Sequence, residues 1–174
     1  MSNSGFTHSL LAQYALAPVG RLEEALEENR RAIELDPYSR VIAGGEPWLV
    51  YLEGRNHAAI EGFRKLLEAD PDDPAPLIGL GSALMAKGDF QGAGAAFEQL
   101  HRAYPSSVTL SRSGYNYARA GRFAEAREVL RQLEDEERRG FVSPVCLAML
   151  YAGLGDNDRA FRYLEAAREQ RESI

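Results

Sequence analysis

The sequence has little of the side-chain chemistry on which most catalytic and metal-binding sites depend. It contains one cysteine and three histidines among 174 residues. A single cysteine, Cys146, excludes a disulfide within the chain and suits a reducing compartment, and its apolar neighbours indicate a partly buried thiol rather than a reactive one. The histidines, His8, His57 and His101, fall in different segments at positions expected to face solvent, and none has a second ligand at metal-binding spacing. The sequence therefore predicts no metal and no cofactor.

Other catalytic motifs are also missing. The chain has neither a glycine-rich phosphate loop nor a nucleophile elbow. Asp70, Asp72 and Asp73 lie close together, but they lack the central glycine and the closing glutamate of a calcium-binding loop. We therefore expect a protein that is not an enzyme and has no catalytic residues.

Long apolar runs and excess positive charge are absent as well. No stretch approaches the length of a membrane span, about 18 apolar residues, and the N-terminus does not have the pattern of a signal peptide. The formal net charge is −6 and the pI about 5.2, so a nucleic-acid backbone would on average be repelled. These properties predict a cytoplasmic protein with no membrane or nucleic-acid partner.

What the sequence does contain is a repeat. Five glycines recur at intervals of 34, 34, 33 and 34 residues, and five alanines follow them, each five residues later. Three prolines keep the same period. The positions are Gly20, Gly54, Gly88, Gly121 and Gly155; Ala25, Ala59, Ala93, Ala126 and Ala160; and Pro37, Pro71 and Pro105. Self-similarity at 34 residues is typical of stacked helix–turn–helix units.

The third unit shows why each repeat forms two helices. Asp73 and Pro74 supply a cap and a first helical position. Apolar residues then follow at intervals of three and four, until Gly88 ends the helix. A second apolar helix starts after Asp89 and stops before Pro105, which cannot continue it. Two such helices are too short to be stable alone, so their apolar faces must be covered by neighbouring units.

The same plan predicts an all-α chain of ten helices in about five repeats. The repeats are 7–37, 38–71, 72–105, 106–138 and 139–172, which together form a single domain over 7–172. We interpret residues 1–6 as disordered or vector-derived. The expected helices are 7–16, 21–35, 47–54, 57–69, 74–87, 90–103, 107–120, 123–137, 141–154 and 157–171.

One of these helices conflicts with local propensity. Gly44, Gly45 and Pro47 stand where the first helix of the second repeat should run, and such residues break helices. We therefore expect this helix to be shortened, irregular, or restarted at Pro47.

The pattern resembles the tetratricopeptide repeat (TPR) over about residues 7–172. Several family positions recur together in the third and fourth units: Leu77, Leu80, Gly81, Leu84, Gly88, Ala93, Phe97 and Pro105, then Gly114, Tyr117, Gly121, Ala126 and Leu130. The sequence departs from the family pattern at Asn29, Pro47 and Arg138. The resemblance implies a right-handed α–α superhelix, a TPR solenoid.

A narrower likeness is to the repeat regions of large bacterial regulators. The stretches 16–21, 32–39, 141–144 and 150–161 resemble the C-terminal TPR regions of winged-helix, TolB-like or kinase-linked regulatory proteins. The resemblance implies that this chain is the repeat portion of such a regulator or a stand-alone relative. It contains no winged-helix or kinase motif of its own.

The family resemblance also implies where a ligand lies: in the concave groove formed by the first helix of each unit. Its expected lining, rich in residue types that dominate binding hot spots, is Trp48, Tyr51, Ile78, Ser82, Met85, Ser111, Arg112, Tyr115, Arg119 and Met149. The bland alternative is that the aromatic residues and methionines only fill the interior of the superhelix. The lysines and asparagines with which some relatives hold a terminal carboxylate are missing.

These observations favour a non-catalytic module that binds a peptide or protein segment of unknown identity. The second hypothesis is a self-associating or sensory arm of a bacterial transcription regulator, because the first unit, with Leu10, Leu11, Tyr14 and Leu16, is apolar enough to pair with a second copy. Polar residues of the last helix, 168–172, look suited to ending the stack.

Overall fold

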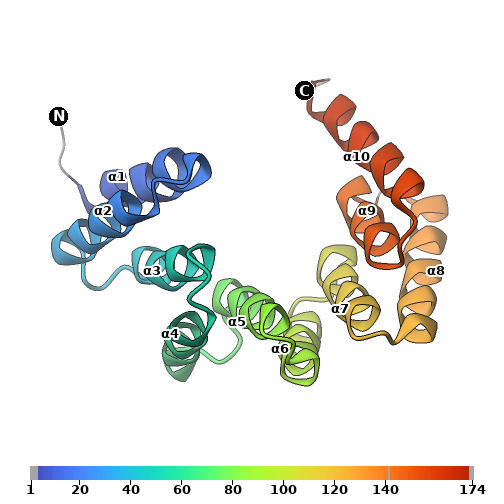
Figure 1. Ribbon diagram of the computed structural model, residues 1–174, viewed down its shortest axis with the longest axis horizontal. Helices are drawn as coiled ribbons and strands as arrows, with labels where there is room; N and C mark the ends of the chain where they lie inside the picture. The colour runs from blue at the N-terminus through green and yellow to red at the C-terminus, as the bar shows by residue number, and fades with distance from the viewer. Residues whose placement is uncertain (1–3, 141, 173–174) are drawn as a thin grey trace. The chain divides into compact units, whose positions relative to one another are not determined.

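The computed structural model describes residues 4–140 and 142–172, and this described part is helical without a strand. The chain divides into two compact units, Met1–Lys87 and Gly88–Ile174. Figure 1 shows the helices of both units, coloured from blue to red along the chain. Each unit is described by itself below.

The first unit contains five α-helices. They are α1 (Gly5–Leu10), α2 (Leu22–Leu35), α3 (Arg40–Leu52), α4 (Asn56–Ala69) and α5 (Pro74–Ala86). A π-helical segment (Leu11–Leu16) and a 3₁₀ turn (Ala17–Val19) extend α1 towards α2. Successive helices pack on each other, and α3 also contacts α5 and α1.

The second unit has five α-helices as well. They are α6 (Phe90–Ala103), α7 (Ser107–Arg119), α8 (Phe123–Arg139), α9 (Pro144–Gly153) and α10 (Asn157–Glu172). Helix α7 contacts α6, α8 and α9, and α9 packs on α10. Because helices appear in all ten expected places and alternate with short turns, the all-helical repeat architecture predicted from the sequence is confirmed.

The recurring glycines are the turns inside the helix pairs. All five have a positive φ between 75° and 83°, a left-handed conformation that side chains with a Cβ rarely adopt. No other described residue has a positive φ. The 34-residue spacing is therefore the spacing of the turns at which the chain reverses direction.

The expectation for the second repeat was wrong, because α3 runs unbroken from Arg40 to Leu52 with Pro47 inside it. Pro47 cannot donate to the carbonyl of Ala43, a loss that costs about 3 kcal/mol in a helix interior. The helix buries Ile42 and Leu49, each 1% exposed, and burying such a side chain contributes about 1.5–3 kcal/mol. Tertiary burial therefore outweighs the local preference.

The chain start also differs from the expectation. Helix α1 begins at Gly5, with the Ser4 hydroxyl accepting from the Thr7 amide. Gly5 is buried, and a Cβ there would lie 2.7 Å from the Ala32 carbonyl oxygen of α2. Residues 1–3 lie outside the described residues, so their expected disorder stays a prediction.

Glycines permit close helix contacts at the centre of each unit. In the first unit the Phe63 ring lies where a Cβ on Gly79 would sit, 2.2 Å from its nearest atom. Thirty-four positions earlier in both helices, Asn29 lies against Gly45 at the same distance. In the second unit Val129 of α8 lies 2.7 Å from the corresponding point on Gly114. The helices could not approach this closely with larger residues.

Asn29 is an unusual member of this series. Its side chain is fully buried, and neither its amide oxygen nor its amide nitrogen has a hydrogen-bond partner. A second buried asparagine, Asn116 in α7, has an unpaired Oδ1 as well, but its Nδ2 donates to the Phe90 carbonyl oxygen at 3.0 Å. An unpaired buried polar group costs about 1–3 kcal/mol.

We predict that Asn29→Leu, which keeps the branched shape, raises the free energy of unfolding by about 1–3 kcal/mol. Urea unfolding followed by circular dichroism measures the change. Asn116→Leu is the matched control, and it should destabilise the chain because it removes the hydrogen bond between the Asn116 amide nitrogen and the Phe90 carbonyl. Equal effects of the two substitutions would contradict the explanation.

Candidate functional site

The first helices of the repeats differ from the second helices in charge. Helices α5 and α9 contain no charged residue, and α7 contains only Arg112 and Arg119. The acidic residues that dominate the chain lie mainly on second helices and in turns. We call the exposed and half-buried sides of α3 and α5 in the first unit, and of α7 and α9 in the second, the first-helix face of each unit, and they carry all but one of the sequence-predicted site residues.

In the first unit, five predicted site residues lie half-buried on α3 and α5. Trp48 makes an edge-to-face contact with Tyr51, with ring centroids 5.8 Å apart, and a second one with Phe63 at 5.4 Å. On α5 the Ser82 hydroxyl donates to the Ile78 carbonyl oxygen at 2.8 Å, so it is already used within its helix. These contacts place the Trp48 ring between the first-helix face and the core.

The remaining α5 residue, Met85, is half-buried on the same helix. Its partial exposure and flexible side chain suit contact with varied partner surfaces. Met149 has the same partial exposure on α9 of the second unit.

In the second unit the predicted residues divide between core and surface. Ser111 is 1% exposed and donates to the Val108 carbonyl oxygen, so it belongs to the core and cannot line a groove. Its short side chain lies below the surface even though its position in the repeat pattern matched a surface one. Tyr115 is half-buried, and its hydroxyl accepts from the exposed Arg119 guanidinium at 3.2 Å. The Arg119 guanidinium also lies 5.9 Å from the Tyr115 ring centroid.

Arg112 has the least satisfied polar group of this face. It is half-buried, and its Nε is buried without a hydrogen-bond partner. Burial lowers the pKa of Arg112 from its usual value, and the nearby Cys146 opposes that shift only in part. A guanidinium held in this state gains from a carboxylate or another acceptor supplied from outside.

The largest pKa change in the second unit is that of Tyr151, which has a structural role. Tyr151 stacks on Tyr163 with centroids 5.6 Å apart, and its hydroxyl donates to the Glu134 carboxylate. Burial, together with this hydrogen bond, raises the pKa of Tyr151 to about 12. The group therefore stays neutral at physiological pH and joins α8, α9 and α10.

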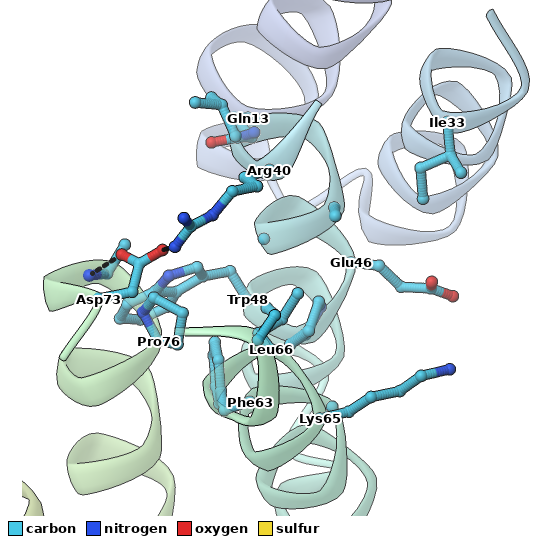
Figure 2. A pocket seen from close by; sticks show the side chains of 17 residues that line it. Gln13, Ile33, Arg40, Glu46, Trp48, Phe63, Lys65, Leu66, Asp73 and Pro76 are labelled. Carbon is cyan, nitrogen blue, oxygen red and sulfur yellow. Dashed lines mark hydrogen bonds and ion pairs between the residues drawn. The ribbon is translucent and has the colours of Figure 1, made fainter. Parts of the chain in front are cut away.

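The first unit contains a cavity of about 530 Å³, which we call the Trp48 pocket (Figure 2). It lies between the π-helical segment, α2, α3, α4 and the start of α5. Its lining consists of Gln13, Ile33, Arg40, Val41, Ala43, Gly44, Glu46, Pro47, Trp48, Gly62, Phe63, Lys65, Leu66, Ala69, Asp73, Ala75 and Pro76.

Charged groups surround the apolar walls of this pocket, as Figure 2 shows. The Arg40 guanidinium donates to Asp70 at 2.8 Å and to Asp73 at 2.7 Å. The hydrogen bond from Arg40 is the main reason that the pKa of Asp70 is lowered. Asp73 also caps α5 by accepting from the Ala75 amide at 3.2 Å. This cluster joins the start of α3 to the turn between α4 and α5.

Sequence reasoning anticipated only Trp48 among these lining residues. The signal that could have shown the pocket was the group of glycines on facing helices, Gly44 and Gly45 on α3 and Gly62 on α4; the first two were interpreted only as helix breakers. A Cβ on Gly44 would meet nothing within 4 Å, whereas one on Gly62 would lie 2.8 Å from the Pro47 ring. Gly44 therefore leaves open space, whereas Gly62 allows Pro47 of α3 to pack closely on α4.

The other polar groups of the described residues do not form a further site. Within 4–140 and 142–172, no three His, Cys, Asp or Glu side chains are arranged to hold a metal ion. His8 was expected to face solvent, but it is largely buried and pairs with Glu28 at 2.5 Å. None of the described helices has the length and apolar character needed to cross a bilayer.

Comparison with known proteins identifies the repeat. Residues 53–108 match the family model of the tetratricopeptide repeat, which confirms the interpretation of the sequence pattern over that part of the chain. No curated protein sequence matches the chain.

Solved structures of TPR proteins share the fold. The Thermus thermophilus TPR protein TTC0263 is 23% identical, with 96% of this chain and 91% of that chain covered and a TM-score of 0.74. MamA from Desulfovibrio magneticus is 16% identical, with 99% and 98% covered and a TM-score of 0.64. YrrB, described as a TPR protein with an unusual peptide-binding site, is 18% identical, with 96% and 86% covered and a TM-score of 0.58.

We predict that Arg112→Met raises the free energy of unfolding by about 1 kcal/mol, because it removes a half-buried cation whose Nε has no partner. The measurement is urea unfolding followed by circular dichroism. Arg127→Met, at an exposed position of α8, is the control and should change stability by less than about 0.5 kcal/mol. A loss of stability in Arg112→Met would mean that the guanidinium has a structural partner.

Proposed function

Because residues 53–108 match the tetratricopeptide repeat and TPR proteins share the fold of the chain, we propose that it is a non-catalytic module that binds a peptide or protein segment on its first-helix face. The observation that carries this proposal is the composition of that face. Half-buried aromatic residues and methionines lie there on helices that are nearly free of carboxylates, in a chain whose net charge is −6. The same proposal includes that residues 7–172 form one domain of five repeats and that the protein is cytoplasmic.

The chemistry of the face suggests the character of the partner. Trp, Tyr and Arg are the residue types most enriched in binding hot spots, where they contribute area with little loss of conformational freedom. Trp48, Tyr51 and Tyr115 are partly exposed while already fixed by neighbours. Arg112 and Arg119 have no carboxylate near them on α7, so a segment with apolar and acidic residues would complement the second unit.

The comparisons support this proposal at the level of the family. TPR proteins bind protein or peptide partners, and YrrB is described as having a peptide-binding site. The proposal keeps the predicted site residues of both units, from Trp48 to Met85 in the first and from Arg112 to Met149 in the second. It leaves out only Ser111, which is buried.

A photo-crosslinking experiment tests the location. We expect a photoreactive phenylalanine analogue placed at Tyr115 to crosslink the partner in native extract, whereas the same analogue at Arg127 on α8 should not. The double variant Met85→Ala and Tyr115→Ala should lose at least about tenfold in capture, since each truncation removes a contact worth about 1 kcal/mol or more. It should keep the helical circular dichroism of the parent. Full capture by the folded double variant would exclude this face.

A second candidate function, self-association as the sensory arm of a regulator, is favoured by the first helix. The stretch Gly5–Val19 contains no Asp, Glu, Lys or Arg. Within it Phe6 is 60%, Leu10 40% and Tyr14 74% exposed. Large exposed apolar side chains on an uncharged helix are typical of an interface.

Light scattering over a range of micromolar concentrations tests this candidate. Self-association predicts a mass that rises with concentration in the parent chain and stays at the monomer value in Tyr14→Glu. Tyr38→Glu, at a tyrosine that is 94% exposed in a turn, is the control and should behave like the parent. A concentration-independent monomer mass for the parent would rule self-association out.

A further inference from the structure

We propose that the Trp48 pocket binds one uncharged aromatic ring with a hydrogen-bond donor, a tyrosine phenol or a tryptophan indole, carried by the partner peptide. This inference rests on the proposed function and names the side chain that anchors the partner in the first unit. Four observations carry it: the wall chemistry, the free volume, the balanced charges and the amide oxygen of Gln13.

The walls favour a flat ring. Trp48 already meets Tyr51 and Phe63 edge to face, and Pro47 and Pro76 supply flat apolar surfaces beside it. Aromatic rings prefer such edge-to-face and offset contacts, which add to the area that they bury. A ring of the ligand would add one more such contact to the aromatic contacts that Trp48 already makes.

The volume allows a ring together with its flanking backbone. Pockets that bind small ligands measure about 300–1,000 Å³. At about 530 Å³ the Trp48 pocket lies in this range and exceeds the volume of one side chain. Gly44 keeps it open, because this glycine stands one helical turn from both Arg40 and Trp48 and has open space where its Cβ would be.

The charges around the pocket exclude a charged ring. Arg40 is bound by Asp70 and Asp73, and Glu46 lies 4.0 Å from Arg30. Lys65 lies on the same side of the pocket as Glu46 (Figure 2). The two positive and two negative lining residues sum to zero charge, and a neutral ligand matches the pocket without displacing the ion pairs of Arg40 or Glu46.

An amide oxygen on the pocket wall calls for a donor on the ring. Gln13 donates from Nε2 to the Ser9 hydroxyl at 2.9 Å, which leaves its amide oxygen as an acceptor on the pocket wall. Next to it, Asn29 is fully buried with neither amide atom paired. Both side chains contact the same side of Gly45, with Asn29 Oδ1 2.2 Å and Gln13 Nε2 3.0 Å from its Cβ position. Asn29 lies behind this wall and does not line the pocket, so a phenol O–H or indole N–H would donate to the Gln13 amide oxygen.

The sole tryptophan makes the test direct. In a ¹H–¹⁵N spectrum of the full chain, Trp48 supplies the only indole N–H signal. We expect p-cresol, the tyrosine side-chain mimic, to shift this signal and saturate it in the millimolar range, as suits so small a ligand. Cyclohexylmethanol, which lacks the aromatic ring, and 4-hydroxyphenylacetate, which adds a negative charge, should bind at least about tenfold more weakly.

A variant that fills the cavity provides the decisive control. Gly44→Leu projects a side chain between Arg40 and Trp48 and replaces a helix-interior glycine, so it should fold at least as well as the parent. It should abolish the p-cresol shift. Gly44→Ala, which fills less of the pocket, and Met85→Leu, outside the pocket, should both retain it. No saturable shift in the parent, or the same shift in folded Gly44→Leu, overturns the proposal.

Partner capture separates this inference from the proposed function. If the ring belongs to the partner peptide, Gly44→Leu loses capture together with p-cresol binding. Capture that persists in Gly44→Leu overturns the peptide source of the ring, while loss of capture in Met85→Ala with Tyr115→Ala still supports the first-helix face. Failure of p-cresol binding together with intact crosslinking from position 115 rejects the pocket alone.

Discussion

The packing of each unit depends on the absence of a Cβ where one helix crosses the next. Phe63 of α4 occupies the place of a Gly79 side chain on α5, and Asn29 of α2 occupies that of Gly45 on α3. In the second unit Val129 does the same at Gly114. Dense packing tolerates little change of volume at such points. The glycines therefore set how closely the helices of a unit approach, and so which side chains remain available to a partner.

The close contacts at glycines leave the first unit densely filled at one point and open at another. Where Phe63 meets Gly79, the interior is filled by an aromatic ring. Where Asn29 meets Gly45, a smaller polar side chain takes the equivalent place, and its amide is left unpaired. The Trp48 pocket opens beside this second contact, bounded by Gln13 and Gly44. Unsatisfied polar groups that persist in a fold are often found where a ligand is bound.

The two units offer different chemistry to a partner. The first has the Trp48 pocket, whose charged residues compensate each other. The second has Arg112 and Arg119 on helix α7, which carries no acidic residue. Arg112 is held half-buried without a partner for Nε, and burial lowers its pKa. Replacing this cation should raise the free energy of unfolding, so its presence agrees with a role in binding rather than in folding.

Sequence alone determined the number and order of the helices and, apart from the start of α3, their approximate ends, because the left-handed turn at each recurring glycine and the 3-4 spacing of apolar residues are local requirements. Tertiary structure decided the rest. It kept α3 continuous through Pro47 because burial of Ile42 and Leu49 outweighs a lost hydrogen bond, and it placed Ser111 in the core although its repeat position pointed outward. It also formed the Trp48 pocket from helices distant in sequence, since cavity depth depends on which neighbouring side chains fill the space and not on the periodicity of one helix.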